Sequence, residues 1–205
     1  PRTPLVTIPN GVDVDYFTPT GYEPEEPVLL FSGNYEYAPN LDAALRLARD
    51  IFPRVRARVP AARLVLVGGN PSPALLACAS DAITITGRVP DIRPYFEHAL
   101  IFVSPLRLGA GIKNKVLEAL AMGAAVVATP LSCDGIPVVP GEHVLLGETD
   151  EELASGVVHL IEDGRRRQAL RQVGRQLIEE HFTWQRVASQ YEALYRTIIA
   201  ERRGR

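Results

Sequence analysis

One glycine-rich stretch of the sequence carries the residue types that bind an anion. The run from Gly109 to Gly111 is followed by Lys113 and Lys115, and residues 111–122 have the composition of a helix. Glycine lets the backbone approach a ligand closely, and the start of a helix presents free N–H groups at the positive end of its dipole. Because two lysines in a first helical turn oppose that dipole, we expect a bound anion to offset their cost.

Helical spacing separates the two lysines. Lys113 lies roughly 100° or more away from the face that holds Lys115, and this face is shared by Gly111, Asn114 and Glu118. We expect Lys115 to bind phosphates and Glu118 to accept hydrogen bonds from hydroxyls, as a carboxylate does for a ribose. The structural alternative is an ordinary amphipathic helix with a Lys115–Glu118 pair on its surface.

Two other chemistries are less well supported by the motifs. Residues 109–114 nearly match G-x-G-x-x-G, but the third glycine is missing and the motif follows a late strand, so a nicotinamide or flavin oxidoreductase is the weaker alternative. Asp13 and Asp15 lie in a turn-rich stretch without further carboxylates or histidines, which favours a role in a turn over a metal site. We expect no metal and no cofactor.

The composition is that of a globular protein. The chain has 205 residues, 46% of them hydrophobic and 22% charged, with a net charge of −2, so a nucleic-acid partner is not expected. No apolar run reaches the ~20 residues that span a bilayer. Cys78 and Cys133 match no metal or redox spacing and are expected to be reduced, which fits the cytoplasm. The chain opens without a Met, so we expect a piece of a longer protein.

Short apolar runs alternate with longer amphipathic stretches. We predict strands at 27–33, 64–67, 83–86, 100–103, 125–128 and 144–146, and helices at 41–59, 90–98, 111–122, 150–162, 165–180 and 184–202, with Asn40 as the first N-cap. Strands that read as continuous apolar runs between helices indicate an α/β fold with a doubly wound, Rossmann-like parallel sheet. Such sheets bind ligands beyond the carboxyl ends of their strands.

With these elements in place, the sequence resembles a known family. Residues 105–130 look like the donor-site signature of group 1 glycosyltransferases of the GT-B fold. Residues 8–13 resemble the segment that leads from the acceptor domain to the donor domain, and residues 86–95 resemble the base-contacting loop. Residues 181–184 resemble the end of such domains, so the similarity covers essentially the whole chain in order.

The resemblance implies a domain division and an activity. Residues 1–26 would be the interdomain linker, 27–183 the Rossmann-like nucleotide-sugar-binding domain of the C-terminal half of a GT-B fold, and 184–205 a helix packing back toward a missing N-terminal acceptor domain. The implied reaction is metal-independent, retaining transfer of a sugar from a UDP- or GDP-sugar in cell-surface polysaccharide synthesis. We expect a cytoplasmic enzyme, with membrane contact only through the missing domain, and an isolated chain that transfers nothing.

The family motifs also imply roles for individual residues. Glu118 matches the second Glu of a paired-Glu motif that binds the donor ribose. Arg88, Val89 and Pro90 match the base-contacting loop, and Gly111, Ile112 and Asn114 match the diphosphate-binding turn. Gly33 and Asn34 match the loop after the first strand. Gly109, from the glycine-rich run, is expected to bind the donor as well.

Two departures from the family bear on the chemistry. Ala110 replaces the first Glu of the pair, which helps to hold the donor sugar in relatives, so sugar recognition is expected to differ. The loop at 34–40 lacks the Arg and Lys of many members, so Lys115 and Arg107 are expected to be the catalytic residues, stabilising the leaving diphosphate during front-side attack. A non-catalytic GT-B-like nucleotide-binding module and a nucleotide-sugar epimerase stay open as alternatives.

Overall fold

The computed structural model describes residues 5–203, with side chains as far as residue 200, so the ends of the predicted linker and C-terminal helix (1–4 and 204–205) lie outside the described residues. Its centre is a six-stranded sheet in the order β3-β2-β1-β4-β5-β6, in which all the pairings are parallel. The strands are β1 (Val28–Ser32), β2 (Arg63–Val67), β3 (Ile83–Ile85), β4 (Ile101–Ser104), β5 (Ala125–Ala128) and β6 (Leu145–Leu146). The predicted Rossmann-like α/β fold is confirmed.

The central strands are buried on both faces. β4 and β5 are buried along their whole length, and in β1 only Val28 is partly exposed. Leu30 of β1 lies between Val65 of β2 and Phe102 of β4 in the register of the sheet. The continuous apolar runs in the sequence therefore follow from helices that cover the sheet on both sides.

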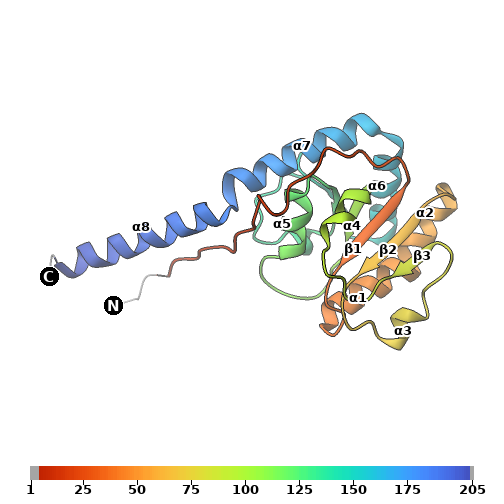
Figure 1. The fold of residues 1–205 in the computed structure, drawn as a ribbon, viewed down its shortest axis with the longest axis horizontal. Coiled ribbons are helices and arrows are strands. Elements are labelled where there is room, and N and C mark those ends of the chain that lie inside the picture. Colours follow the sequence, from red (N-terminus) through yellow and green to blue (C-terminus); the bar gives the residue numbers. More distant parts are fainter. Residues whose placement is uncertain (1–4, 204–205) are drawn as a thin grey trace.

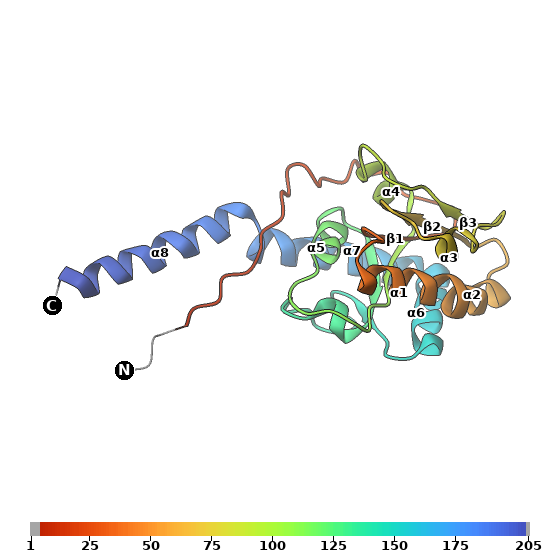
Figure 2. The same cartoon turned by 90° about the horizontal axis from the view of Figure 1, so that it is seen from below.

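The covering elements are α1 (Ala38–Arg46), a π-helical turn (Leu47–Ile51), α2 (Phe52–Arg58), α3 (Pro73–Leu76), α4 (Arg93–His98), α5 (Asn114–Ala121), a 3-10 turn (Pro130–Cys133), α6 (Asp150–Glu162), α7 (Gly164–His181) and α8 (Trp184–Arg203). Seen along the sheet, α1, α2 and α6 lie on one side and α4 on the other (Figure 2). The strand order reverses between β1 and β4, which is the switch point of a doubly wound sheet.

Three helix starts differ from the predictions. α1 begins at Ala38 with Pro39 in its first turn, so Asn40 lies inside the helix and is not its N-cap. The helix predicted from residue 90 begins at Arg93.

The start of α5 is the third difference, and it concerns the glycine-rich stretch. Gly111 has a φ of 72°, which is incompatible with a right-handed helix, and Lys113 is extended at φ −98° and ψ 97°. α5 therefore begins at Asn114, with Lys113 as its N-cap residue. The prediction that Gly111 shares a helical face with Lys115 is wrong for this reason.

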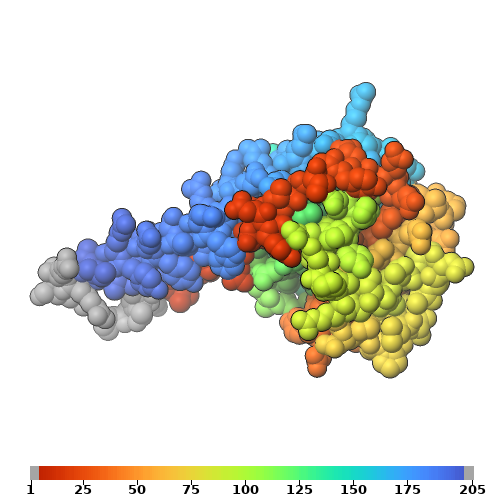
Figure 3. Space-filling model, in the orientation of Figure 1, coloured from red at the N-terminus to blue at the C-terminus, as the bar shows by residue number. Residues whose placement is uncertain are grey.

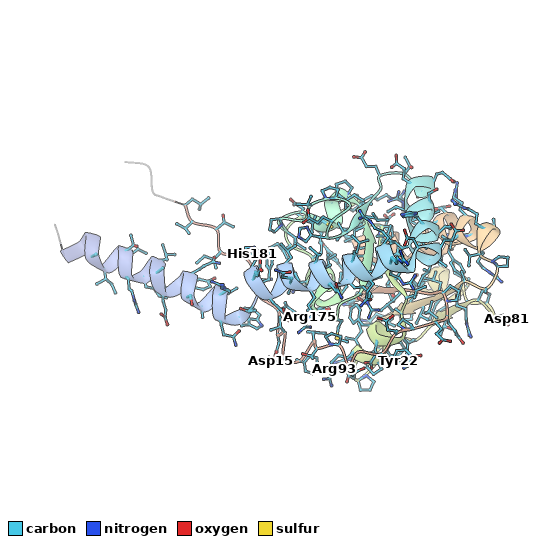
Figure 4. The ribbon with its side chains drawn as sticks, turned by 90° about the horizontal axis from the view of Figure 1, so that it is seen from above. Asp15, Tyr22, Asp81, Arg93, Arg175 and His181 are labelled. Atoms are coloured by element: carbon cyan, nitrogen blue, oxygen red, sulfur yellow. The ribbon has the colours of Figure 1, made fainter. Side chains whose placement is uncertain are left out.

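From Val12 to the start of β1, the chain lies along the domain as an extended strap. The backbone N–H of Val12 donates to the Phe182 carbonyl at 2.7 Å, and Arg175 of α7 donates to the Phe17 carbonyl at 3.0 Å. Figure 3 shows this segment, in red, crossing the face of the domain. Arg93 donates to the Tyr16 carbonyl at 3.4 Å, so arginines from two helices, Arg93 and Arg175, hold the strap (Figure 4). The Asp13 carboxylate accepts hydrogen bonds from the backbone N–H groups of Asp15 and Tyr16, as the predicted turn requires.

The first described residues and α8 both extend away from the sheet domain on the same side (Figure 1). In the part of the chain that the structure describes, no helix is both long and apolar enough to cross a bilayer.

Candidate functional site

A cavity of about 520 Å³ opens at the carboxyl ends of β1, β2 and β3, next to the switch point of the sheet. Its volume falls within the range of small-molecule sites, roughly 300–1,000 Å³, and its position is where doubly wound sheets bind ligands. The lining residues are Ser32, Gly33, Asn34, Asn40, Val67, Gly68, Gly69, Asn70, Arg88, Val89, Ile92, Lys115 and Glu118.

Two glycines form the contact between the loops that follow β1 and β2. Gly33 N–H donates to the Val67 carbonyl at 3.0 Å, which extends the pairing of the two strands by one residue. Gly68 has a φ of 153°, and a Cβ at this position would overlap the carbonyl oxygen of Gly33. Only glycine fits at Gly68, and the close approach of the two backbones leaves the space above them open to a ligand.

Lys115 brings a positive charge into this space from the first turn of α5. Its ammonium lies 4.8 Å from the centre of the Phe31 ring and donates a hydrogen bond to Oδ1 of Asn40. Burial lowers the pKa of Lys115 to about 8; Glu118 raises this pKa and Lys113 lowers it further. A cation that burial has partly stripped of water gains more from an anion than an exposed lysine does.

Glu118 lies one helical turn after Lys115 and also lines the cavity. Burial raises the pKa of its carboxyl group, and the charge of Lys115 opposes that shift. No ion pair within 4.0 Å joins the two side chains among those found in the described residues. The alternative of an exposed Lys115–Glu118 surface pair is therefore wrong, because both groups face a cavity in which a ligand can reach them.

The start of α5 has no side-chain cap. Lys113 is the N-cap residue, and because an ammonium only donates hydrogen bonds, it cannot accept from the first-turn N–H groups; it donates to the Gly111 carbonyl instead. An α-helix with an uncapped start next to a buried lysine is an environment that suits an anion.

The opposite end of the cavity is formed by the loop after β3. Arg88 and Val89 line it together with Ile92, whereas Pro90 does not. Arg88 is exposed at the rim and Val89 is half-buried. This end offers an apolar surface beside an exposed guanidinium, against which a flat heterocycle can stack.

Several residues that the sequence placed in the site lie outside the cavity. Arg107 forms a two-pronged ion pair with Asp42 of α1, with both N–O distances at 2.8 Å. Asn114 accepts a hydrogen bond from Asn10 at 3.3 Å. Three residues of the loop before α5 also lie outside the cavity: Gly109 faces Pro39, Gly111 is exposed, and Ile112 packs against Gly135.

Sequence reasoning missed other lining residues, mainly in the loop after β2. Gly68, Gly69 and Asn70 follow that strand directly, and Asn70 adopts a positive φ of 56°. Asn70 donates to the Asn34 side-chain oxygen at 3.2 Å, so the loops after β1 and β2 are tied together by amides. The signal was present, because a Gly-Gly-Asn run at the end of a strand beside β1 must border the switch point.

Within residues 5–203, no group of three or more His, Cys, Asp or Glu side chains gathers in a way that could hold a metal ion.

The cavity lies beside the switch point of a doubly wound sheet, where α/β domains of this class bind their ligands. The chain belongs to the group 1 glycosyl transferases, since the model of that family matches residues 26–163. The fold is that of GT-B glycosyltransferases: the structure superimposes on sucrose-phosphate synthase from Thermosynechococcus elongatus with a TM-score of 0.77 and 23% identity, over 95% of this chain and 52% of that chain.

Two relatives illustrate the similarity in sequence. A phosphatidyl-myo-inositol mannosyltransferase of Mycobacterium tuberculosis is 29% identical over 208 residues, which cover 94% of this chain and 54% of the relative. A lipopolysaccharide core biosynthesis mannosyltransferase, LpcC, of Rhizobium leguminosarum bv. viciae is 26% identical over 99% of this chain and 62% of the relative. The chain thus spans little more than half the length of these relatives.

Proposed function

We propose that this chain is the donor-binding domain of a glycosyltransferase that transfers a sugar from a nucleoside-diphosphate sugar to an acceptor, with retention and without a metal ion. One observation carries the proposal: Lys115 and Glu118 face the same cavity one helical turn apart. A nucleoside diphosphate presents an anion and a ribose diol at a comparable spacing, which match an ammonium and a carboxylate.

In this assignment the ligand crosses the switch point. The base lies against Arg88 and Val89, the ribose hydroxyls donate to Glu118, and the diphosphate lies between Lys115 and the loop at Gly33 and Asn34. Lys115 and the uncapped start of α5 stabilise the charge that develops on the leaving diphosphate, which is the role a metal ion has in other transferases.

Arg107 has a secondary role in the proposal. The Asp42 carboxylate holds its guanidinium, and the pKa of Arg107 is raised mainly by the hydrogen bonds to Asp42 and by its charge. To contact the diphosphate, Arg107 must exchange this partner for the ligand, so we assign the main catalytic charge to Lys115.

The acceptor belongs to a second domain, to which α8 is the proposed link. α8 leaves the sheet domain (Figures 1 and 2) and exposes large apolar side chains along its length: Trp184, Tyr191, Tyr195, Ile198 and Ile199. Apolar side chains at this density on a projecting helix favour contact with another folded unit. The names of the two mannosyltransferase relatives support an acceptor in glycolipid or polysaccharide synthesis. A cytoplasmic location is part of the proposal, and the free thiols of Cys78 and Cys133 suit that compartment.

The test is calorimetric titration of the 205-residue chain with UDP and with GDP. We expect one of them to bind, and we expect Lys115→Ala and Glu118→Gln each to weaken binding at least ~10-fold, because each removes a charge-assisted hydrogen bond. Lys113→Ala is the matched control, because Lys113 lies two residues before Lys115 but outside the cavity. The affinity of this variant for the nucleotide should stay within ~3-fold of that of the parent chain.

Undiminished binding in both Lys115→Ala and Glu118→Gln would refute the site. The chain alone should also transfer no sugar, since the acceptor surface belongs to the second domain, and measurable transfer by this chain would contradict that division. Binding without transfer by the whole protein would favour the non-catalytic module, the alternative that Ala110 supports.

A further inference from the structure

Asn40 lies at the centre of the polar contacts on the phosphate side of the cavity. Its Nδ2 donates to the Asn34 backbone carbonyl at 2.9 Å, and its Oδ1 accepts from the Lys115 ammonium. A Cβ at Gly33 would lie 2.8 Å from the Asn40 Cγ and 3.1 Å from the Lys115 Nζ. The carboxamide therefore bridges the loop after β1 and the start of α5, directly beside the glycine that opens the cavity.

The orientation of this carboxamide is fixed by chemistry. An ammonium only donates hydrogen bonds, so the oxygen must face Lys115, and a backbone carbonyl only accepts, so the nitrogen must face Asn34. Both ends of the Asn40 side chain are thus occupied, and neither serves the backbone of α1. The π face of Phe31 holds the ammonium from β1, so Lys115 is placed from two elements besides its own.

Because the Asn40 carboxamide is uncharged, it orients the Lys115 ammonium without changing its charge. The charged groups that face it are Glu118 on α5, which favours the ammonium form, and Lys113 before α5, which disfavours it. From α1 and β1 come only a carboxamide and an aromatic ring. The ammonium is oriented on that side without being neutralised, so its charge stays available to an incoming anion.

We propose that Asn40 is a positioning residue of the donor site: its carboxamide directs the Lys115 ammonium toward the diphosphate and, being uncharged, leaves that charge to the ligand. This inference rests on the proposed function, in which Lys115 binds the diphosphate.

Two substitutions test the two halves of this role. Asn40→Asp keeps the shape but places a carboxylate beside the ammonium and an acceptor opposite the Asn34 carbonyl. Asn40→Leu keeps the approximate volume but removes both hydrogen bonds. The affinity of the 205-residue chain for UDP and GDP is measured by calorimetry from pH 7.5 to 10, above the last titration of a phosphate, whose pKa is near 6.

The parent chain should lose affinity as the pH rises through about 8, because Lys115 then loses its proton. Both variants should bind at least ~10-fold more weakly at pH 7.5, with opposite changes in the pH profile. A carboxylate stabilises the ammonium, so the midpoint should move up by about one pH unit in Asn40→Asp, and loss of the acceptor should move it down in Asn40→Leu.

Folding is checked by thermal unfolding of each variant, and Asn40→Ser replaces Asn40→Leu if the latter does not fold. Equal losses of affinity with an unchanged midpoint in both variants would show that Asn40 only supports the loop, and would overturn the inference. Retained affinity in both, with loss in Lys115→Ala, would overturn it while leaving the proposed function intact. A parent chain that binds neither UDP nor GDP would overturn both.

Discussion

Arg46 connects three segments at the carboxyl edge of the sheet, and its removal should destabilise the domain strongly. The guanidinium is 7% exposed on α1; its Nε donates to Asp150 at 2.6 Å. Its two terminal nitrogens donate to the carbonyls of Pro105 at 3.0 Å and Glu148 at 2.9 Å. The side chain therefore joins α1 to the residues that follow β4 and to those that begin α6. Replacement by methionine keeps most of the buried aliphatic volume and removes all three hydrogen bonds.

The expected loss of stability in Arg46→Met follows from the polar groups that lose their partner. Breaking a buried ion pair costs about 3–5 kcal/mol, because the remaining charge loses its partner. Asp150 is 31% exposed and lies in the first turn of α6, where water and the helix dipole partly compensate its charge. The Pro105 and Glu148 carbonyls lose a charged donor as well. We therefore expect Arg46→Met to lower the free energy of unfolding by about 3 kcal/mol, at the lower end of that range.

Urea unfolding followed by far-ultraviolet circular dichroism measures this change, provided that the m-value stays constant. Arg107→Met is the matched control, because it removes another arginine that pairs with a helical Asp, Asp42 of α1, but at a side-chain exposure of 59%. A surface pair contributes about 0–1 kcal/mol, so the control should stay near the parent. A loss below 1 kcal/mol in Arg46→Met, or equal losses in the two variants, would refute the argument that burial makes the difference.

Two further stability predictions use the same assay. Gly68→Ala should lower the free energy of unfolding by more than ~3 kcal/mol and abolish nucleotide binding, because the added Cβ would overlap the Gly33 carbonyl under the cavity. A fully stable variant that still binds would contradict this packing. Thr149→Ala removes a capping box whose hydroxyl accepts from the Glu152 N–H at 3.1 Å, and should cost about 1 kcal/mol; the conservative Thr149→Ser should lose little, and equal losses would argue against the cap.

The strands were predictable from the sequence because their physical cause is local. Residues 125–128 read as an apolar run, and β5 has those bounds, since a strand covered on both faces needs an unbroken apolar sequence. The start of α1 was less predictable because two signals competed there. At α1 an Asn in a suitable N-cap position competed with a Pro one residue earlier, and the Pro decided.

The site residues also divide into those that local spacing predicts and those that only tertiary contacts bring to the cavity. Lys115 and Glu118 were found because one helical turn fixes their spacing, whatever the rest of the chain does. Asn40 was not found, because its side chain reaches the cavity only through the tertiary contact with Lys115. The position of Arg107 was equally out of reach, since its partner, Asp42, lies 65 residues away in the sequence.

The lack of Arg and Lys in residues 34–40 and the burial of Lys115 are consequences of one constraint. The start of α5 is positive, Lys115 lies in its first turn, and burial already disfavours the charge of that lysine. A second cation within hydrogen-bonding distance, at position 40, would add like-charge repulsion and drive Lys115 toward its neutral form. A carboxylate at the same position would pair with the ammonium and repel the diphosphate. A carboxamide avoids both effects, so the proposed function, in which α5 supplies the positive charge for the diphosphate, requires an uncharged acceptor on α1.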